Sequence, residues 1–218
     1  MVSGGTMKPK VLVIGDYTRF KYHQLPNMDR VMQSLLGDEM DVLCTEDYGE
    51  LRAERIAGYD LVISYSDRWV DPIDDASADG LLAYLADGGA LLAIHNGLAI
   101  QTHEKLKALT GARFTGHPPY CWLDVRPVSD HEWLRGIGPF RITDEPYQFE
   151  FLPGSGCEPL LEYEFEGQPY PAGWIRPYGR GQVVYLMPGH DGSTFLNDTY
   201  QRLLLQVCRG LVSESGHA

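Results

Sequence analysis

Three histidines stand where catalytic or metal-binding chemistry is expected, because each follows an apolar run that predicts a buried strand. His95 directly ends one such run, residues 90–94, whereas His190 and His23 lie in polar loops shortly after two others. Imidazole exchanges protons near neutral pH and also binds metals through a neutral ring nitrogen. For His95 alone, a hydrogen-bonded turn residue is an equally good interpretation, but the recurrence at other strand ends favours chemistry.

Carboxylates and a fourth histidine accompany these residues. Asp16 and Asp67 also follow strand-like runs, while His117 and Glu145 lie on loops that can cover the same edge of a sheet. Because the carboxyl ends of parallel strands meet at one edge, we expect these side chains to converge with the three histidines. Proton transfer between imidazole and carboxylate groups is the chemistry that we expect there.

A metal site is the alternative use of the same imidazoles. Two or three histidines with one carboxylate form catalytic zinc or non-haem metal centres, and the ligand candidates here are His23, His95 and His190. No H-E-x-x-H or other closely spaced metal motif is present, so such a site would form from distant loops. Proton transfer is therefore preferred and no cofactor is assigned, with a divalent ion such as zinc left open.

Motifs of several other enzyme classes are missing. Neither G-x-G-x-x-G nor G-x-x-x-x-G-K-[ST] follows a strand-like run, which counts against a nucleotide cofactor. Neither G-x-S-x-G nor G-x-C-x-G is present, and His95 stands where a strand-to-helix turn would carry the nucleophile. These patterns argue against a serine hydrolase and against a cysteine-dependent amidotransferase.

Strand-like and helix-like segments alternate through the first half of the chain. Short apolar runs predict buried strands, and apolar residues spaced three and four apart predict helices. The predicted strands span residues 10–16, 40–44, 59–65, 90–94 and 183–187, and the predicted helices span 28–36, 51–57, 75–86, 102–109 and 199–211. This order predicts an α/β fold with a doubly wound, mostly parallel sheet flanked by helices.

The texture changes after Gly111. Proline-containing loops and partly alternating runs replace the buried strands, and residues 157–165 and 168–175 predict an added antiparallel hairpin. The glycines at 179 and 181 predict a tight turn before the last strand.

Composition bounds the class of protein. The formal net charge is −12 without a readable basic face, so neither nucleic acid nor a membrane is an expected partner. Scattered cysteines and the lack of a signal-like or 18-residue apolar segment predict reduced thiols and a cytoplasmic location. We expect one domain over residues 1–218, with 1–7 as a disordered leader and 213–218 as a frayed tail. A homodimer is expected from general frequencies alone.

Residues 10–211 resemble the trehalose-utilisation (ThuA-like) family. The stretches that carry the resemblance are the loop ending at His23 and residues 88–95, 114–118, 144–147, 171–174, 179–185 and 189–190. The resemblance implies a fold similar to the class I glutamine amidotransferases and to flavodoxin. It also implies a role in carbohydrate metabolism, with a disaccharide or keto-sugar as the ligand. By position His95 replaces the amidotransferase cysteine, so glutamine amidotransferase activity is not implied.

Two hypotheses follow from the residues and the resemblance together. In the first, an isomerase, lyase or hydrolase acts on a sugar or keto-sugar, with His95 and His190 as general acid and base and Glu145 orienting them. His23 and His117 then bind the ligand or a divalent metal. Further substrate contacts are assigned to Asp16, Tyr147, Trp174 and Arg180. In the second hypothesis, the scaffold is a non-catalytic sugar-binding or regulatory module.

Overall fold

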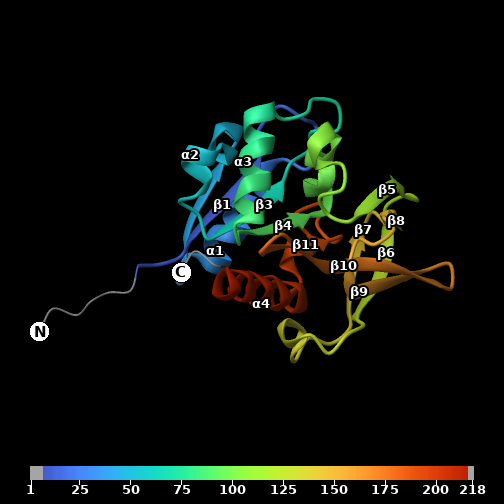
Figure 1. Cartoon of the computed structure of the whole chain (residues 1–218). Coiled ribbons are helices and arrows are strands. Elements are labelled where there is room, and N and C mark those ends of the chain that lie inside the picture. Colours follow the sequence, from blue (N-terminus) through green and yellow to red (C-terminus); the bar gives the residue numbers. More distant parts are fainter. Residues whose placement is uncertain (1–6, 216–218) are drawn as a thin grey trace, which may run out of the picture.

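The computed structural model describes residues 7–215 as a mixed nine-stranded sheet covered by helices, with a separate two-stranded sheet beside it (Figure 1). The large sheet has the order β2-β1-β3-β4-β11-β10-β9-β6-β7. Residues 1–6 and 216–218, which belong to the predicted leader and tail, lie outside the described residues.

Five neighbouring strands form what we call the parallel half of the sheet. They are β2 (Asp41–Thr45), β1 (Lys10–Gly15), β3 (Leu61–Tyr65), β4 (Ala90–Ile94) and β11 (Gly181–Leu186). The helices that cover them are α1 (Leu25–Leu36), α2 (Ala53–Ile56), α3 (Asp75–Ala86) and α4 (Asp198–Glu214). The order of these strands confirms the predicted α/β class.

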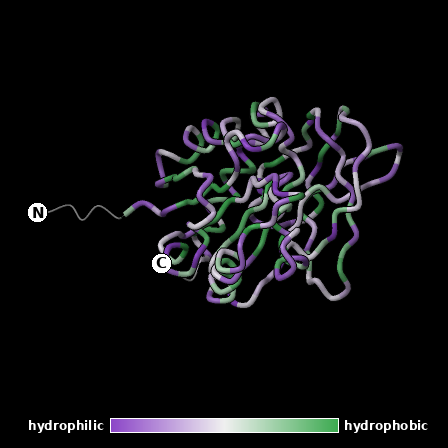
Figure 2. Tube along the Cα trace, turned by 90° about the horizontal axis from the view of Figure 1, so that it is seen from above, coloured by the Kyte–Doolittle hydropathy of each residue, from purple (hydrophilic) through white to green (hydrophobic). Residues whose placement is uncertain are grey.

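Alternate residues of β1 show why these strands read as continuous apolar runs. Val11 and Val13 belong to the core that packs against α1 and α4, whereas Leu12 and Ile14 belong to the core that packs against α2 and α3. A strand buried on both faces needs apolar side chains at every position. Figure 2 shows the resulting hydrophobic segments running through the interior of the molecule.

The remaining four strands form the antiparallel half of the sheet. They are β10 (Gln168–Tyr178), β9 (Glu158–Phe165), β6 (Cys121–Pro127) and β7 (Phe140–Asp144). The separate sheet pairs β5 (Ala112–Gly116) with β8 (Gln148–Phe151). The predicted hairpin is present as β9 and β10, but it is one part of a larger antiparallel region than the sequence indicated.

The antiparallel half curls back toward the parallel half. Three strands separate β7 from β11 in the sheet order, yet the Asp144 carboxylate at the end of β7 accepts a hydrogen bond from the N–H of Gly189, just after β11. The distance is 2.8 Å. The end of β7 and the loop after β11 therefore meet at one edge of the parallel half.

Two predicted helices are wrong in form. Residues 51–57 are split between a 3₁₀ helix, Tyr48–Leu51, and α2, and the helix expected at 102–109 is replaced by 3₁₀ helices at His95–Thr102 and Glu104–Leu106. The Thr102 hydroxyl donates to the carbonyl oxygens of Arg68 and Ala99, which diverts the chain from a regular α-helix there. The tail is also more ordered than expected, since α4 continues to Glu214.

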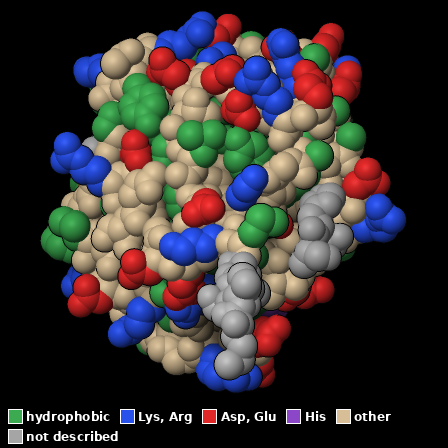
Figure 3. Space-filling view, turned by 90° about the vertical axis from the view of Figure 1, so that its left-hand side faces the viewer, with side chains coloured by type: hydrophobic (Ala, Val, Ile, Leu, Met, Phe, Trp, Pro, Cys, Tyr) green, Lys and Arg blue, Asp and Glu red, His purple; other side chains and the backbone are tan. Residues whose placement is uncertain are grey.

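The described surface is mixed in charge. Figure 3 shows Lys and Arg side chains interspersed with Asp and Glu over the face that lies to the left in Figure 1. No helix formed by residues 7–215 has both the length and the apolarity needed to cross a bilayer. The thiols of Cys44, Cys121, Cys157 and Cys208 are free.

Candidate active site

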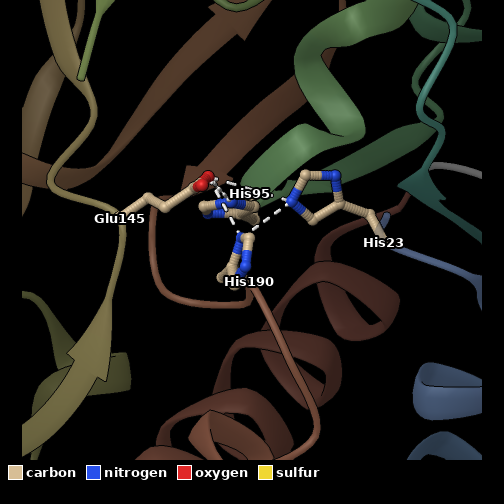
Figure 4. A group of neighbouring side chains, drawn as sticks. All are labelled: His23, His95, Glu145 and His190. Atoms are coloured by element: carbon tan, nitrogen blue, oxygen red, sulfur yellow. Dashed lines mark hydrogen bonds and ion pairs between the residues drawn. The ribbon is translucent and has the colours of Figure 1, made fainter. Parts of the chain in front are cut away.

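Four side chains from four strand ends meet at one edge of the sheet (Figure 4). His95 directly follows β4, Glu145 directly follows β7, His190 lies in the loop after β11, and His23 lies between β1 and α1. One nitrogen or carboxylate oxygen of each lies within 4.8 Å of those of the other three. We call these residues the His–Glu cluster; the sequence singled out all four.

The backbone at two of the four residues is in the left-handed region, which is uncommon for residues other than glycine. φ is +51° at His23 and +49° at His95. Just after His95 the backbone passes so close to β3 that only glycine fits at position 97. A Cβ atom there would lie 1.9 Å from the carbonyl oxygen of Ser64. Such sparsely populated conformations persist only where surrounding contacts hold them, and they concentrate at functional sites.

Hydrogen bonds on the outer side of two imidazoles determine which nitrogen faces the cluster. His23 Nδ1 lies 3.1 Å from Asp67 Oδ1, and His95 Nδ1 lies 2.7 Å from the carbonyl oxygen of Met187. Since a carboxylate and a carbonyl only accept, each Nδ1 carries a proton, and each Nε2 faces the cluster with a lone pair when its ring is neutral. His95 Nε2 is buried and has no hydrogen-bond partner among the described residues.

Glu145 is the common neighbour of the three imidazoles. Its Oε2 lies 3.0 Å from His190 Nδ1, 3.4 Å from His95 Nε2 and 3.9 Å from His23 Nε2. Burial raises the pKa of Glu145, but the neighbouring imidazoles of His190 and His95 outweigh burial and hold that pKa well below its usual range. Glu145 is therefore ionised at neutral pH.

His23 and His190 differ in protonation. Burial lowers the pKa of His23 more than its hydrogen bond to Asp67 raises it, so His23 is neutral at pH 7. At His190 burial also lowers the pKa, but the hydrogen bond with Glu145 and the charge of that carboxylate outweigh burial and raise it. The cluster thus combines the ionised carboxylate of Glu145 with the neutral imidazole of His23, and the proton that His190 retains is stabilised by that carboxylate.

The donor set fits a divalent metal ion such as zinc. Zinc prefers histidine nitrogens and carboxylate oxygens, and tetrahedral bonds of about 2.0–2.1 Å separate its ligand atoms by roughly 3.3–3.4 Å. Here His23 Nε2 lies 2.9 Å from His190 Nδ1, and His95 Nε2 lies 3.4 Å from Glu145 Oε2. An outer N–H bonded to a carboxylate or carbonyl, as in His23 and His95, is typical of metal-binding histidines.

Asp144 joins the loops beneath the cluster. The side chain is fully buried, and its Oδ2 accepts from the N–H groups of Gly189 at 2.8 Å and His190 at 3.3 Å. Its Oδ1 accepts from the N–H of Glu145 at 2.8 Å and lies 3.5 Å from His95 Nδ1. Sequence reasoning assigned no role to Asp144, although it begins the stretch 144–147 that carries part of the family resemblance.

A cavity of about 340 Å³, which we call the cluster cavity, opens beside these residues. Its lining is Tyr22, His23, Asp67, Trp69, Phe114, His117, Glu145 and Tyr147. The Tyr147 ring packs against His95, with ring centroids 4.1 Å apart. His117 Nδ1 lies 2.9 Å from the carbonyl oxygen of Pro118, so its Nε2 presents a lone pair 3.9 Å from Glu145 Oε1. The cavity combines ring surfaces with a few polar groups, as small-molecule sites do.

Asp16 does not join the cluster. Its carboxylate is buried, and it accepts hydrogen bonds from Tyr48 Oη at 2.7 Å and from the Arg68 guanidinium at 3.2 Å. The Arg68 guanidinium in turn lies 3.8 Å from the centroid of the Tyr48 ring. The convergence expected for Asp16 is therefore absent, because these partners hold its side chain in a separate buried network.

Trp174 and Arg180, two further expected substrate contacts, also lie outside the cluster cavity. Trp174 is 1% exposed, and its ring N–H donates to the carbonyl oxygen of Thr110 at 2.7 Å, so it is a core residue of β10. Arg180 lies in the turn before β11, at the opposite end of that strand from the cluster, and pairs with Asp87 at 3.2 Å. The sequence already placed this turn before the last strand, at the end away from the expected site, so the substrate contact assigned to Arg180 is wrong.

Comparison with known proteins gives a family and a fold. A family model described as ThuA, trehalose utilisation, matches residues 10–209. No curated protein sequence matches the chain. A putative ThuA-like protein from Bacteroides uniformis has a similar structure, with a TM-score of 0.79 and 19% identity over 99% of this chain and 97% of that one. A second, from Parabacteroides merdae, has a TM-score of 0.78 and 16% identity over 96% and 92% of the two chains.

A larger enzyme contains a similar fold. The β-galactosidase from Rahnella sp. R3 matches with a TM-score of 0.64 and 15% identity over 94% of this chain but only 31% of its own length. The similarity at this level of identity concerns the fold alone.

Proposed function

Because the chain belongs to the ThuA trehalose-utilisation family, we propose that it is an enzyme that acts on a carbohydrate with the help of a divalent metal. The metal would be held by His23, His95, His190 and Glu145. The observation that carries the proposal is the approach of three imidazole nitrogens and one carboxylate oxygen to within 4.8 Å of one another.

The fixed tautomers of His23 and His95 suit metal binding as well as the proton transfer that the sequence alone preferred. The Nε2 lone pairs of His23 and His95 face the interior of the cluster, and a nitrogen bound to a metal cannot also move a proton. The buried Nε2 of His95 has no other partner among the described residues, and a metal would satisfy it.

A bound divalent ion would act as a Lewis acid toward a carbonyl or an anionic oxygen of the sugar. The residues that remain for proton transfer line the cluster cavity. His117 is suited to accept a proton, since its Nε2 lone pair lies beside that cavity and its Nδ1 is bonded to Pro118. Removal of a proton next to a carbonyl suits isomerisation or β-elimination of a keto-sugar.

The test is hydrogen exchange on a candidate substrate. The zinc-loaded protein is incubated in D₂O with a keto-disaccharide, and with trehalose as the unoxidised reference, while NMR follows deuterium incorporation beside the carbonyl. We expect His95→Gln to lower the exchange rate by two orders of magnitude or more. His131→Asn is the matched control. His131 does not line the cluster cavity; it caps a short 3₁₀ helix, and asparagine can cap that helix too.

Two results contradict the proposal. If His95→Gln exchanged deuterium into the substrate at the wild-type rate, the His–Glu cluster would not be the site of the reaction. Binding of sugars without exchange or conversion, whatever divalent ion is supplied, would instead favour the non-catalytic sugar-binding module.

A further inference from the structure

A second cavity, of about 420 Å³, adjoins the cluster cavity and differs from it in chemistry. The two cavities share Trp69 and Phe114, whose ring centroids lie 5.2 Å apart. Beyond this aromatic pair, the second cavity is walled by Leu98, Ala108 and Leu152. We call it the apolar cavity. A ligand in the cluster cavity would reach it by passing over the two shared rings.

The uncharged polar side chains of the apolar cavity are occupied by internal hydrogen bonds. Gln101 Oε1 accepts from the N–H of Thr110 at 2.7 Å, and the Thr102 hydroxyl donates to the carbonyl oxygen of Arg68 at 2.8 Å. A sugar ring carries hydroxyl groups around its edge, and burying them without hydrogen bonds is unfavourable. The wall therefore suits an apolar group better than a second sugar.

The two cations of the wall are also paired. Arg113 on β5 forms an ion pair with Glu150 on β8, and Lys107 pairs with Glu104 at 2.6 Å. All four of these charged groups are mostly exposed to solvent. The aliphatic stems of Arg113 and Lys107 add to the apolar surface of the cavity.

We propose that the apolar cavity binds the apolar aglycone, such as an aryl group, of a glycoside whose sugar lies in the cluster cavity. The inference rests on the proposed function, because it assumes that a carbohydrate occupies the cluster cavity. The substrate class is then glycosides of phenols or other apolar alcohols rather than disaccharides. Rings of this kind pack favourably against Trp69 and Phe114.

The test is a binding comparison that does not require turnover. Isothermal titration measures the affinities of phenyl glucosides, methyl glucosides (both anomers of each) and trehalose for the zinc-loaded protein. We expect the phenyl glucoside to bind about tenfold more tightly than the methyl glucoside of the same anomer, from burial of the ring. Leu152→Asp should abolish that preference, because it places a charge in the apolar cavity, and Leu152 is not among the residues that line the cluster cavity.

The control and the remaining outcomes separate this inference from the function that it assumes. Leu43→Asp makes the same change on β2, where Leu43 is 43% exposed, and should leave the preference intact. Equal affinity for phenyl and methyl glucosides, or tighter binding of trehalose, would overturn the aglycone inference and leave the carbohydrate site standing. Failure to bind any of the sugars would contradict both.

Discussion

The two halves of the sheet contribute different parts of one site. The parallel half supplies imidazoles from loops after β1, β4 and β11, whose strand ends meet at one edge as in other open α/β sheets. The antiparallel half supplies Glu145, which reaches that edge because the sheet curls back, and Asp144 helps to hold the two loops together. The nitrogen donors thus follow from topology, whereas the oxygen donor depends on tertiary contacts, of which those of Asp144 are fully buried.

The largest effect should come from breaking these contacts of Asp144. Asp144→Ala leaves the N–H groups of Gly189 and Glu145 without their buried acceptor, and we expect a loss of roughly 3–5 kcal/mol in the free energy of unfolding. Urea denaturation measures it. Asp124→Ala is the control, because Asp124 is exposed on the neighbouring strand β6 and its ion pair with Arg141 is solvated. Equal stability of the two variants would show that the halves are joined by other contacts.

The proton-transfer role assigned to the loop after β5 is tested by His117→Gln. We expect kcat to fall by about 10²-fold or more, because general acid–base catalysis typically contributes that much. Zinc stoichiometry should stay at the wild-type value, since His117 Nε2 approaches only Glu145 Oε1, at 3.9 Å. A variant with unchanged kcat would assign the proton transfer to another group.

A smaller effect, on zinc affinity, should follow from removing the hydrogen bond that orients His23. Asp67→Ala removes the hydrogen-bond acceptor that fixes the His23 tautomer. Loss of such an outer partner typically weakens metal binding by about 10–100-fold. Competition with a zinc chelator of known affinity measures the change. Unaltered affinity would mean that His23 needs no fixed orientation, or that it is not a ligand.

The close approach of the 3₁₀ helix His95–Thr102 to the end of β3 can be tested at Gly97. Gly97→Ala places a Cβ 1.9 Å from the Ser64 carbonyl oxygen, and the backbone shift should cost roughly 1–3 kcal/mol. Gly138→Ala is the control in the antiparallel half, because nothing lies within 4 Å of the added atom there. Thermal unfolding should separate the two variants by several degrees, in line with the usual relation between Tm and stability. Coincident curves would contradict the close approach.

The halves also differ in how far the sequence predicts them. The short apolar runs of β1, β3, β4 and β11 are typical of strands buried on both faces, so these strands and the histidines after them follow from the pattern. The strands of the antiparallel half are half-exposed and partly alternating, and their pairing is set by long-range contacts. The sequence therefore predicted the β9–β10 hairpin but not how the other strands of that half pair with it.

The same division applies to the site residues. The three histidines were found from their places after predicted strands and Glu145 from its place on a loop that can cover the same edge, and the four residues meet in the structure. Trp174 was misplaced, because a tryptophan near a loop end looks alike whether it faces a ligand or the core, and here it is 1% exposed. Which imidazole nitrogen carries the proton depends on the Met187 carbonyl and on Asp67, and no sequence pattern reports such contacts.

The central claim is that the His–Glu cluster binds a metal, and metal analysis tests it most directly. Untagged protein is equilibrated with zinc, passed through a desalting column and analysed by inductively coupled plasma mass spectrometry, together with His95→Ala and the control His131→Asn. We predict one zinc per chain in the wild type and in the control, and none in His95→Ala with its circular dichroism unchanged. Zinc-free wild-type protein, or equal zinc in His95→Ala, would contradict the claim.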